Sequence, residues 1–219
     1  GTYAGERGPL FRLAVVTALL SVVTLGIYRF WAKTRIRRYI WSSVSGGRDA
    51  FEYTGTGMEK LLGFLVAIMV LAVYLGIVQM ILFYFGLTLF TEPQTPEQML
   101  MQMAAIYITV LAVVPLIFFA QYRARRYKLA RTRWRGVRFG MEKGGWGYAL
   151  RAMGHWVLTL LTLGILLPRQ TFRLEKYMTD RSWYGDAQFH QQGRWTGLYP
   201  AARHLFLAIA ILLGGELVA

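Results

Sequence analysis

The stretch "RRYKLARTRWRGVRFG", residues 125–140, interleaves basic and aromatic side chains and contains no acidic residue. Arginine and lysine bind phosphates and aromatic rings stack on bases, so the pattern could in principle serve nucleic-acid binding. Directly after an apolar segment, however, basic residues are a topology signal, and anionic lipid attracts them by about 1 kcal/mol each. The stretch follows such a segment, so we predict contact with lipid headgroups and no nucleic-acid role.

The residues expected to make this contact lie at the feet of the second and third apolar segments. We predict that they face anionic headgroups or an acidic protein partner. They are Arg37, Arg38, Arg123, Arg125, Arg126, Arg131, Arg133 and Arg135.

The sequence carries few groups suited to catalysis or metal binding. Cysteine is absent, and His155, His190 and His204 lie far apart with no helical spacing between them. No G-x-S-x-G elbow occurs, and "KGGWG" lacks the spacing of a phosphate-binding loop. We therefore predict no catalytic residue, no metal and no cofactor. For a lipid-modifying enzyme Asp180, Asp186 and His190 would be the candidate groups, although turn formation is the commoner role of such residues.

A second set of candidates consists of polar residues inside apolar segments, which are costly in lipid and often functional. Arg151 and His155 stand four apart on one helical face of the fourth segment, and Gln79 lies in the second. The structural alternatives are snorkelling for Arg151 and a hydrogen bond to a neighbouring helix for His155. Glu216, in the last segment, fits a position at the far interface.

The elements that position these candidate residues are expected to be apolar helices, because the composition of the chain is that of a membrane protein. Hydrophobic residues make up 55% of the 219 residues and charged ones 16%, with a mean hydropathy of +0.36. Five stretches approach or exceed the roughly 20 residues that cross about 30 Å of hydrocarbon. They are Leu10 to Trp31, Leu61 to Phe90, Met99 to Ala120, Gly147 to Leu167 and Leu198 to Ala219.

Charge gives the orientation of these segments. "TEPQTPE", between the second and third, is acidic and free of Lys and Arg, as expected for a non-cytoplasmic loop, whereas both feet of this helical hairpin are basic. A third basic block, from Arg169 to Arg194, would lie outside if the fourth segment crossed fully. Either the fourth segment turns back at "TLTLGILLP", Thr162 to Pro168, or it spans and breaks the charge rule.

The sequence also repeats itself. Thr-Leu-Gly-Ile occurs twice, and each copy is followed at the same spacings by Tyr, Gly, Phe and Gly. The matched pairs are Gly26 and Gly164, Tyr39 and Tyr177, Gly47 and Gly185, Phe51 and Phe189, and Gly55 and Gly193. The opening stretch supplies a partial third copy through Tyr127, Gly136 and Phe139.

Each copy predicts a small β-hairpin below a membrane segment. In "RTRWRGVRF" the side chains alternate in type around Arg135-Gly136, and Gly46-Gly47 and Tyr184-Gly185 supply a turn glycine in the other copies. An isolated two-stranded hairpin is marginal in water, so the three hairpins are expected to pack together.

At "TLGIYRFWAKTRIRRY", "GRDAFEYTGTG" and "RYKLARTRWRGVRFG", the chain resembles the YjgN-like family of bacterial inner-membrane proteins, over Tyr3 to about Tyr199. The resemblance implies a multi-pass protein of the bacterial inner membrane and supplies no catalytic residues. The chain departs from the family pattern at Phe30, where a proline is expected. The residue that would break the helix sharply after the first segment is therefore absent.

The prediction is therefore an all-α integral membrane protein with about five apolar helical segments, the first and fourth being candidates for re-entrant segments, and short cytoplasmic β-hairpins. The divisions are 1–60, 61–120, 121–146 and 147–199, with a last segment at 198–219. Two functions remain open. One is a non-enzymatic accessory, scaffold or lipid-organising subunit whose basic face binds anionic lipid or a protein of a larger complex; the other is a small-solute transporter or channel built from the repeats.

Overall fold

A computed structural model describes residues 1–90, 92–204 and 207. The chain forms two compact units, one comprising Gly1–Val113 with Tyr127–Phe139, the other Val114–Arg126 with the chain from Gly140 onward. Most of the predicted fifth segment, including Glu216, lies outside the described residues.

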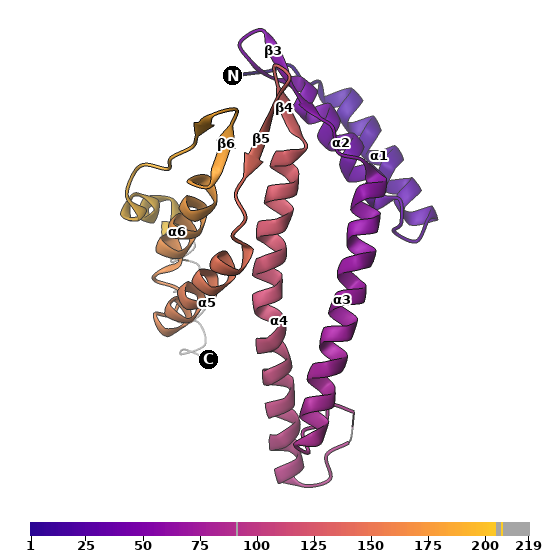
Figure 1. Ribbon diagram of the computed structural model, residues 1–219, viewed down its shortest axis with the longest axis vertical. Helices are drawn as coiled ribbons and strands as arrows, with labels where there is room; N and C mark the ends of the chain where they lie inside the picture. Colours follow the sequence, from indigo (N-terminus) through magenta and orange to yellow (C-terminus); the bar gives the residue numbers. More distant parts are fainter. Residues whose placement is uncertain (91, 205–206, 208–219) are drawn as a thin grey trace. The chain divides into compact units, whose positions relative to one another are not determined.

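The first unit contains a short helical hairpin and most of a long one, whose second helix contributes residues 114–126 to the second unit (Figure 1). Helices α1 (Arg7–Val23) and α2 (Arg29–Ser43) form the short hairpin. Helix α3 (Gly57–Tyr84) and helix α4 (Pro96–Ala130) form the long one, and α4 continues through Pro115. Thr56 and Thr95 cap the two long helices by accepting hydrogen bonds from the amides of Glu59 and Gln98.

Helices α3 and α4 have the length and apolar composition to cross a membrane, which confirms the second and third predicted segments. Their apolar side chains are largely exposed, with Phe83 at 71% and Leu100 at 68%. Two polar contacts join them: the Tyr74 hydroxyl donates to the Ala112 carbonyl at 3.2 Å, and the Gln79 amide donates to Thr109 Oγ1 at 3.0 Å. Such a surface is stable in lipid and unfavourable in water.

The first predicted segment does not continue to Trp31, because the chain turns back between α1 and α2. Leu25 and Gly26 adopt φ angles of 51° and 88°, in the left-handed region that ends a helix. The hydroxyl of Thr24 donates to the Leu20 carbonyl and accepts from the Tyr28 amide. With 17 residues, α1 is about 25 Å long, which is short of the hydrocarbon thickness.

The second unit contains a short hairpin with the same turn. Helices α5 (Gly145–Leu161) and α6 (Leu167–Thr179) are joined through Leu163 and Gly164, with φ angles of 49° and 86°. Thr162 repeats the two hydrogen bonds of Thr24. The chain therefore turns between Thr162 and Pro168, as in the first of the two alternatives for the fourth segment.

The chain is mostly helical, as predicted, but it is not all-α, because its described part also holds a seven-stranded sheet with the strands in sequence order. The strands are β1 (Thr2–Tyr3), β2 (Val44–Gly46), β3 (Asp49–Tyr53), β4 (Thr132–Trp134), β5 (Val137–Met141), β6 (Ser182–Tyr184) and β7 (Ala187–Gln188), and a 3₁₀ helix, η1, covers Trp195–Leu198. Residues 137–139 of β5 belong to the first unit and residues 140 and 141 to the second.

The three predicted hairpins are present as β2–β3, β4–β5 and β6–β7, each with a two-residue turn. Gly47, Gly136 and Gly185 all have positive φ, as the turns require. Pairing of β1 with β2 and of β3 with β4 joins the strands of the first unit into a ladder, which removes the instability of single hairpins.

One backbone hydrogen bond recurs beside each helical hairpin. It runs from the amide that follows the incoming strand to the carbonyl that precedes the outgoing strand. The three bonds are Ala4 N to Ser43 O at 2.8 Å, Thr54 N to Arg131 O at 2.8 Å and Glu142 N to Arg181 O at 2.9 Å. Each helical hairpin, short or long, therefore begins and ends at neighbouring strands.

Candidate functional site

The best-defined polar cluster of the first unit lies where α2, β3 and α3 meet. The ring of Tyr53, which is 3% exposed, has the Arg37 guanidinium 5.2 Å and the Lys60 ammonium 5.1 Å from its centre. Arg37 also donates to the Tyr53 hydroxyl at 3.3 Å, and Lys60 donates to Thr34 Oγ1 at 2.8 Å. One buried aromatic ring therefore holds two cations near each other.

The first turn of α3 carries an acid, Glu59, that is already engaged by residues at the end of α4. Glu59 accepts a hydrogen bond from the Tyr127 hydroxyl at 2.8 Å and forms an ion pair with Arg131 at 3.0 Å. Nearby, the Trp41 indole donates to Thr132 Oγ1 at 3.0 Å. These contacts tie the foot of the long hairpin to α2 and β4.

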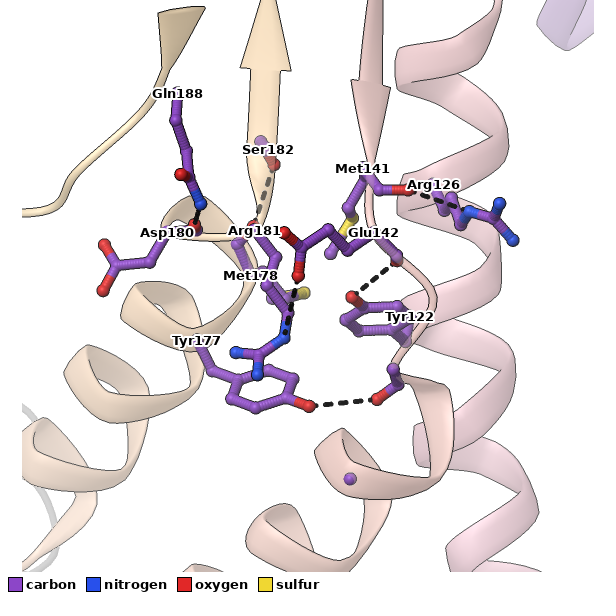
Figure 2. A network of polar contacts seen from close by, with 12 residues as sticks. Tyr122, Arg126, Met141, Glu142, Tyr177, Met178, Asp180, Arg181, Ser182 and Gln188 are labelled. Atoms are coloured by element: carbon purple, nitrogen blue, oxygen red, sulfur yellow. Dashed lines mark hydrogen bonds and ion pairs between the residues drawn. The ribbon is translucent and has the colours of Figure 1, made fainter.

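In the second unit the corresponding cluster surrounds Tyr122 and Tyr177 (Figure 2). The Tyr122 hydroxyl, on α4, donates to the Glu142 carbonyl at 2.9 Å, and the Tyr177 hydroxyl, on α6, donates to the Gly144 carbonyl at 3.2 Å. The Arg181 guanidinium lies 3.8 Å from the centre of the Tyr177 ring and 3.8 Å from the Glu142 carboxylate. Hydroxyls thus satisfy the backbone where β5 leads into α5.

An arginine of this cluster is neutralised within the fold. Arg125 forms an ion pair with Glu175 of α6 at 2.5 Å and also lies within 3.5 Å of the Thr179 hydroxyl. Its neighbour Arg126 donates to the Met141 carbonyl at 2.9 Å.

The remaining arginines predicted to face lipid or a partner also have contacts within the fold. Arg38 donates to the Gly55 carbonyl, Arg123 lies over the Phe119 ring, and Arg135 pairs with Asp49 at 2.6 Å. Arg133 is opposite Glu52 on one side and Arg138 on the other, and its buried Nε has no hydrogen-bond partner in the described part of the chain. Most of these side chains remain partly exposed, so their contacts within the fold neither support nor contradict binding of lipid or a partner.

Two of the three polar candidates inside apolar segments, Gln79 and Arg151, have side-chain partners within the fold. Gln79 bonds Thr109, as described above. Arg151 donates to the Gly147 carbonyl at 3.0 Å and lies 4.7 Å from the centre of the Tyr177 ring. His155 is half-buried in α5, and its carbonyl accepts from Thr159.

The candidates for a lipid-modifying enzyme occupy the end of α6 and the hairpin after it. Asp186 lies in the β6–β7 turn, and His190 is exposed. Burial alone would raise the pKa of Asp180, but the Gln191 amide and Lys176 stabilise the carboxylate and hold its pKa below the usual value. In residues 1–90, 92–204 and 207, no group of three acids and histidines could hold a metal ion.

Sequence reasoning missed Thr34, Tyr53, Lys60 and Glu175 as parts of these clusters. Tyr53 and Lys60 flank Gly57, the first residue of α3, where a Cβ atom would lie 2.6 Å from Trp31. Gly145 begins α5 against Phe119 in the same way. Trp31 and Gly57 thus recur eighty-eight positions later as Phe119 and Gly145. This spacing can be read from the sequence and would have located both clusters.

Two long apolar helices with exposed side chains and basic ends define the class of the molecule, which is an integral membrane protein. The chain belongs to the family described as "Bacterial protein of unknown function (DUF898)", which matches residues 1–219.

Relatives agree with this assignment and confirm the predicted resemblance. The chain is similar to the inner membrane protein YjgN of Salmonella typhimurium (strain LT2), with 26% identity over 168 residues, 75% of this chain and 37% of that protein. The inner membrane protein YjgN of Escherichia coli (strain K12) is 29% identical over 145 residues, 65% of this chain and 31% of that protein. The chain thus spans about a third of these relatives. No solved structure matches. The protein is therefore located in the bacterial inner membrane.

Proposed function

We propose that this protein is a non-enzymatic membrane subunit that organises anionic lipid, or docks a partner, through the basic feet of its helical hairpins. The observation that carries the proposal is helix α2. It contains Arg29, Lys33, Arg35, Arg37 and Arg38 and no acidic residue. None of these five cations forms an ion pair within the described residues.

The helix that bears these charges also carries the side chains of a membrane interface. Phe30, Trp31, Tyr39 and Trp41 alternate with the cations along α2. Aromatic rings of this kind settle at headgroup depth, where arginine and lysine meet lipid phosphates. A basic helix with aromatic residues and no acids is therefore suited to an anionic leaflet.

The proposed topology follows from the helix lengths. Helices α3 and α4 cross the bilayer, while α1–α2 and α5–α6 enter it and return, so that every β-hairpin lies on the cytoplasmic side. The chain would then consist of three copies of one module, strand, helical hairpin and strand. The recurring amide-to-carbonyl bond beside each hairpin and the shared turn at Gly26 and Gly164 support this reading.

Lipid selectivity tests the proposal. The full chain is reconstituted in nanodiscs of phosphatidylcholine with a minor fraction of phosphatidylglycerol, extracted, and the lipids that remain bound are counted by native mass spectrometry. We expect phosphatidylglycerol to be enriched over its share of the mixture, and we expect the double variant R35Q/R38Q to reduce that enrichment.

Equal retention of the two lipids by the wild-type protein would contradict the lipid-organising role. Ion or solute flux across vesicles that contain the purified chain would instead support the transporter alternative.

A further inference from the structure

The two polar junctions described above have the same frame but a different charge balance. Each is built from an outgoing helix, a strand and the next incoming helix, with Gly57 against Trp31 in one and Gly145 against Phe119 in the other. Counting from these landmarks, Arg37 corresponds to Arg125, and Lys60 corresponds to Tyr148.

In the second junction the charge at the corresponding positions is balanced within the fold. Arg125 has the carboxylate of Glu175 as its partner, and a tyrosine, Tyr148, stands where the first junction has a lysine. The Tyr148 ring lies 5.6 Å from that of Tyr122, so uncharged contacts fill the remaining space.

The first junction gathers cations without an acid. Arg37 and Lys60 lie on the ring of Tyr53, and Lys33 precedes Arg37 by one helical turn on the same face of α2. The nearest acid in sequence, Glu59, is engaged by Tyr127 and Arg131. Glu52 points away, because successive residues of a strand face opposite sides of the sheet and Tyr53 faces α2.

Donors at this junction exceed the acceptors supplied by the fold. A guanidinium and an ammonium carry several N–H groups each. The structure gives Arg37 one hydrogen bond, to the Tyr53 hydroxyl, and Lys60 one, to Thr34 Oγ1. Thr34 is 4% exposed and fixes the Lys60 ammonium, while Tyr53 fixes both cations, so the charged groups are positioned in advance.

A tetrahedral oxyanion fits this arrangement, because several oxygens can accept from donors that converge from two helices. Lys60 lies in the first turn of α3, just before its apolar run begins at Leu61, which is the depth at which a lipid phosphate lies. We propose that Lys33, Arg37 and Lys60 bind a single phosphate group, supplied by an anionic lipid headgroup. This inference rests on the proposed function and assigns the lipid contact to one junction.

The test uses the full chain in nanodiscs, with the lipid mixture given above, and counts bound phosphatidylglycerol by native mass spectrometry. The variants are R37Q/K60Q, which removes both cations at the ring, and K33Q, which removes an exposed cation and leaves the buried contacts intact. The matched control is R48Q, a change of the same type in the exposed β2–β3 turn. A parallel arm measures the binding of inorganic phosphate to the detergent-solubilised protein by calorimetry.

We expect about fivefold weaker phosphatidylglycerol binding for each cation removed, since each contributes about equally to attraction by anionic lipid. R48Q should retain the affinity of the wild-type protein. Saturable binding of inorganic phosphate, lost in K33Q and in R37Q/K60Q, without a lipid preference in the wild-type protein would support the site and identify a soluble phosphate as its source.

Phosphatidylglycerol enrichment that persists unchanged in both K33Q and R37Q/K60Q would overturn this site while leaving the proposed function standing. Equal loss in R48Q would also overturn it, because it would show an effect of net charge alone. Absence of both lipid enrichment and phosphate binding in the wild-type protein would remove the lipid-organising role as well. Since K33Q alters no contact that the structure shows, its result does not depend on the folding of the double variant.

Discussion

The short hairpins α1–α2 and α5–α6 share a turn although their sequences differ around it. Both place a leucine and a glycine at positive φ, and both use a threonine hydroxyl to link the two helices. Only α6 begins with a proline, Pro168; α2 has Phe30 at that position. The turn is therefore set by Thr-Leu-Gly and not by the proline.

The strongest test of whether the two hairpins are equivalent is to map the membrane side of each one. The chain has no native cysteine, so single cysteines at Arg48, Arg135, Asp186 and Gln94 can be labelled one at a time. If α1–α2 and α5–α6 return without crossing, as proposed, the first three cysteines, in the β-hairpin turns, will react from the cytoplasmic side and Gln94 from the periplasm. Labelling at Asp186 from the periplasm would show that the α5–α6 pair crosses the membrane and would end the equivalence of the two hairpins.

The next largest effect is expected at the turn glycines. G26A and G164A each place a Cβ atom at a φ near 87°, which costs about 1–2 kcal/mol, although no neighbouring atom lies within 4 Å. Unfolding in detergent mixtures gives the change in free energy for each variant. The control is G154A, inside α5 with open space around it, which should stabilise the helix by about 0.5–1 kcal/mol. A neutral G26A beside a destabilising G164A would show that only the second turn is constrained.

The threonine hydroxyls offer a finer comparison. Thr24 accepts the Tyr28 amide at 2.9 Å, whereas Thr162 accepts the Leu166 amide at 3.4 Å. T24V should lose about 1 kcal/mol of stability and T162V less, because the longer bond is weaker. T24S and T162S keep the hydroxyl and serve as controls. The same unfolding measurement applies, and a larger loss in T162V would contradict the geometric argument.

The smallest effect is predicted at the proline itself. P168A removes the fixed φ at the start of α6 and should cost no more than about 1 kcal/mol, because α2 forms after the same turn without proline. Circular dichroism and the midpoint of thermal unfolding provide the measurement. Loss of the α5–α6 hairpin in P168A, seen as reduced helix content, would mean that the two turns form for different reasons.

Much of this architecture was predictable from local sequence. The apolar runs of α3 and α4 and the glycine turns of three β-hairpins each depend on a few neighbouring residues, and both were predicted; the turn between Thr162 and Pro168 was one of two alternatives. The turn after Val23 was considered only as a re-entrant alternative for the first segment, because the expected proline was missing and the hydrophobic run continued to Trp31. The hairpins were expected to pack together, but their pairing in one sheet was not predicted, since pairing of β3 with β4 unites residues about eighty positions apart.

The membrane class, the two long apolar helices and the basic character of their feet follow from hydropathy and charge, which act locally and sum along the chain. Which cations are neutralised depends on the folded arrangement. Arg125 and Arg37 look alike in sequence, yet Glu175 from a helix fifty residues away reaches the first, while the second shares the Tyr53 ring with Lys60. Charge balance depends on distances in space, and these arise when helices and strands distant in the chain pack together.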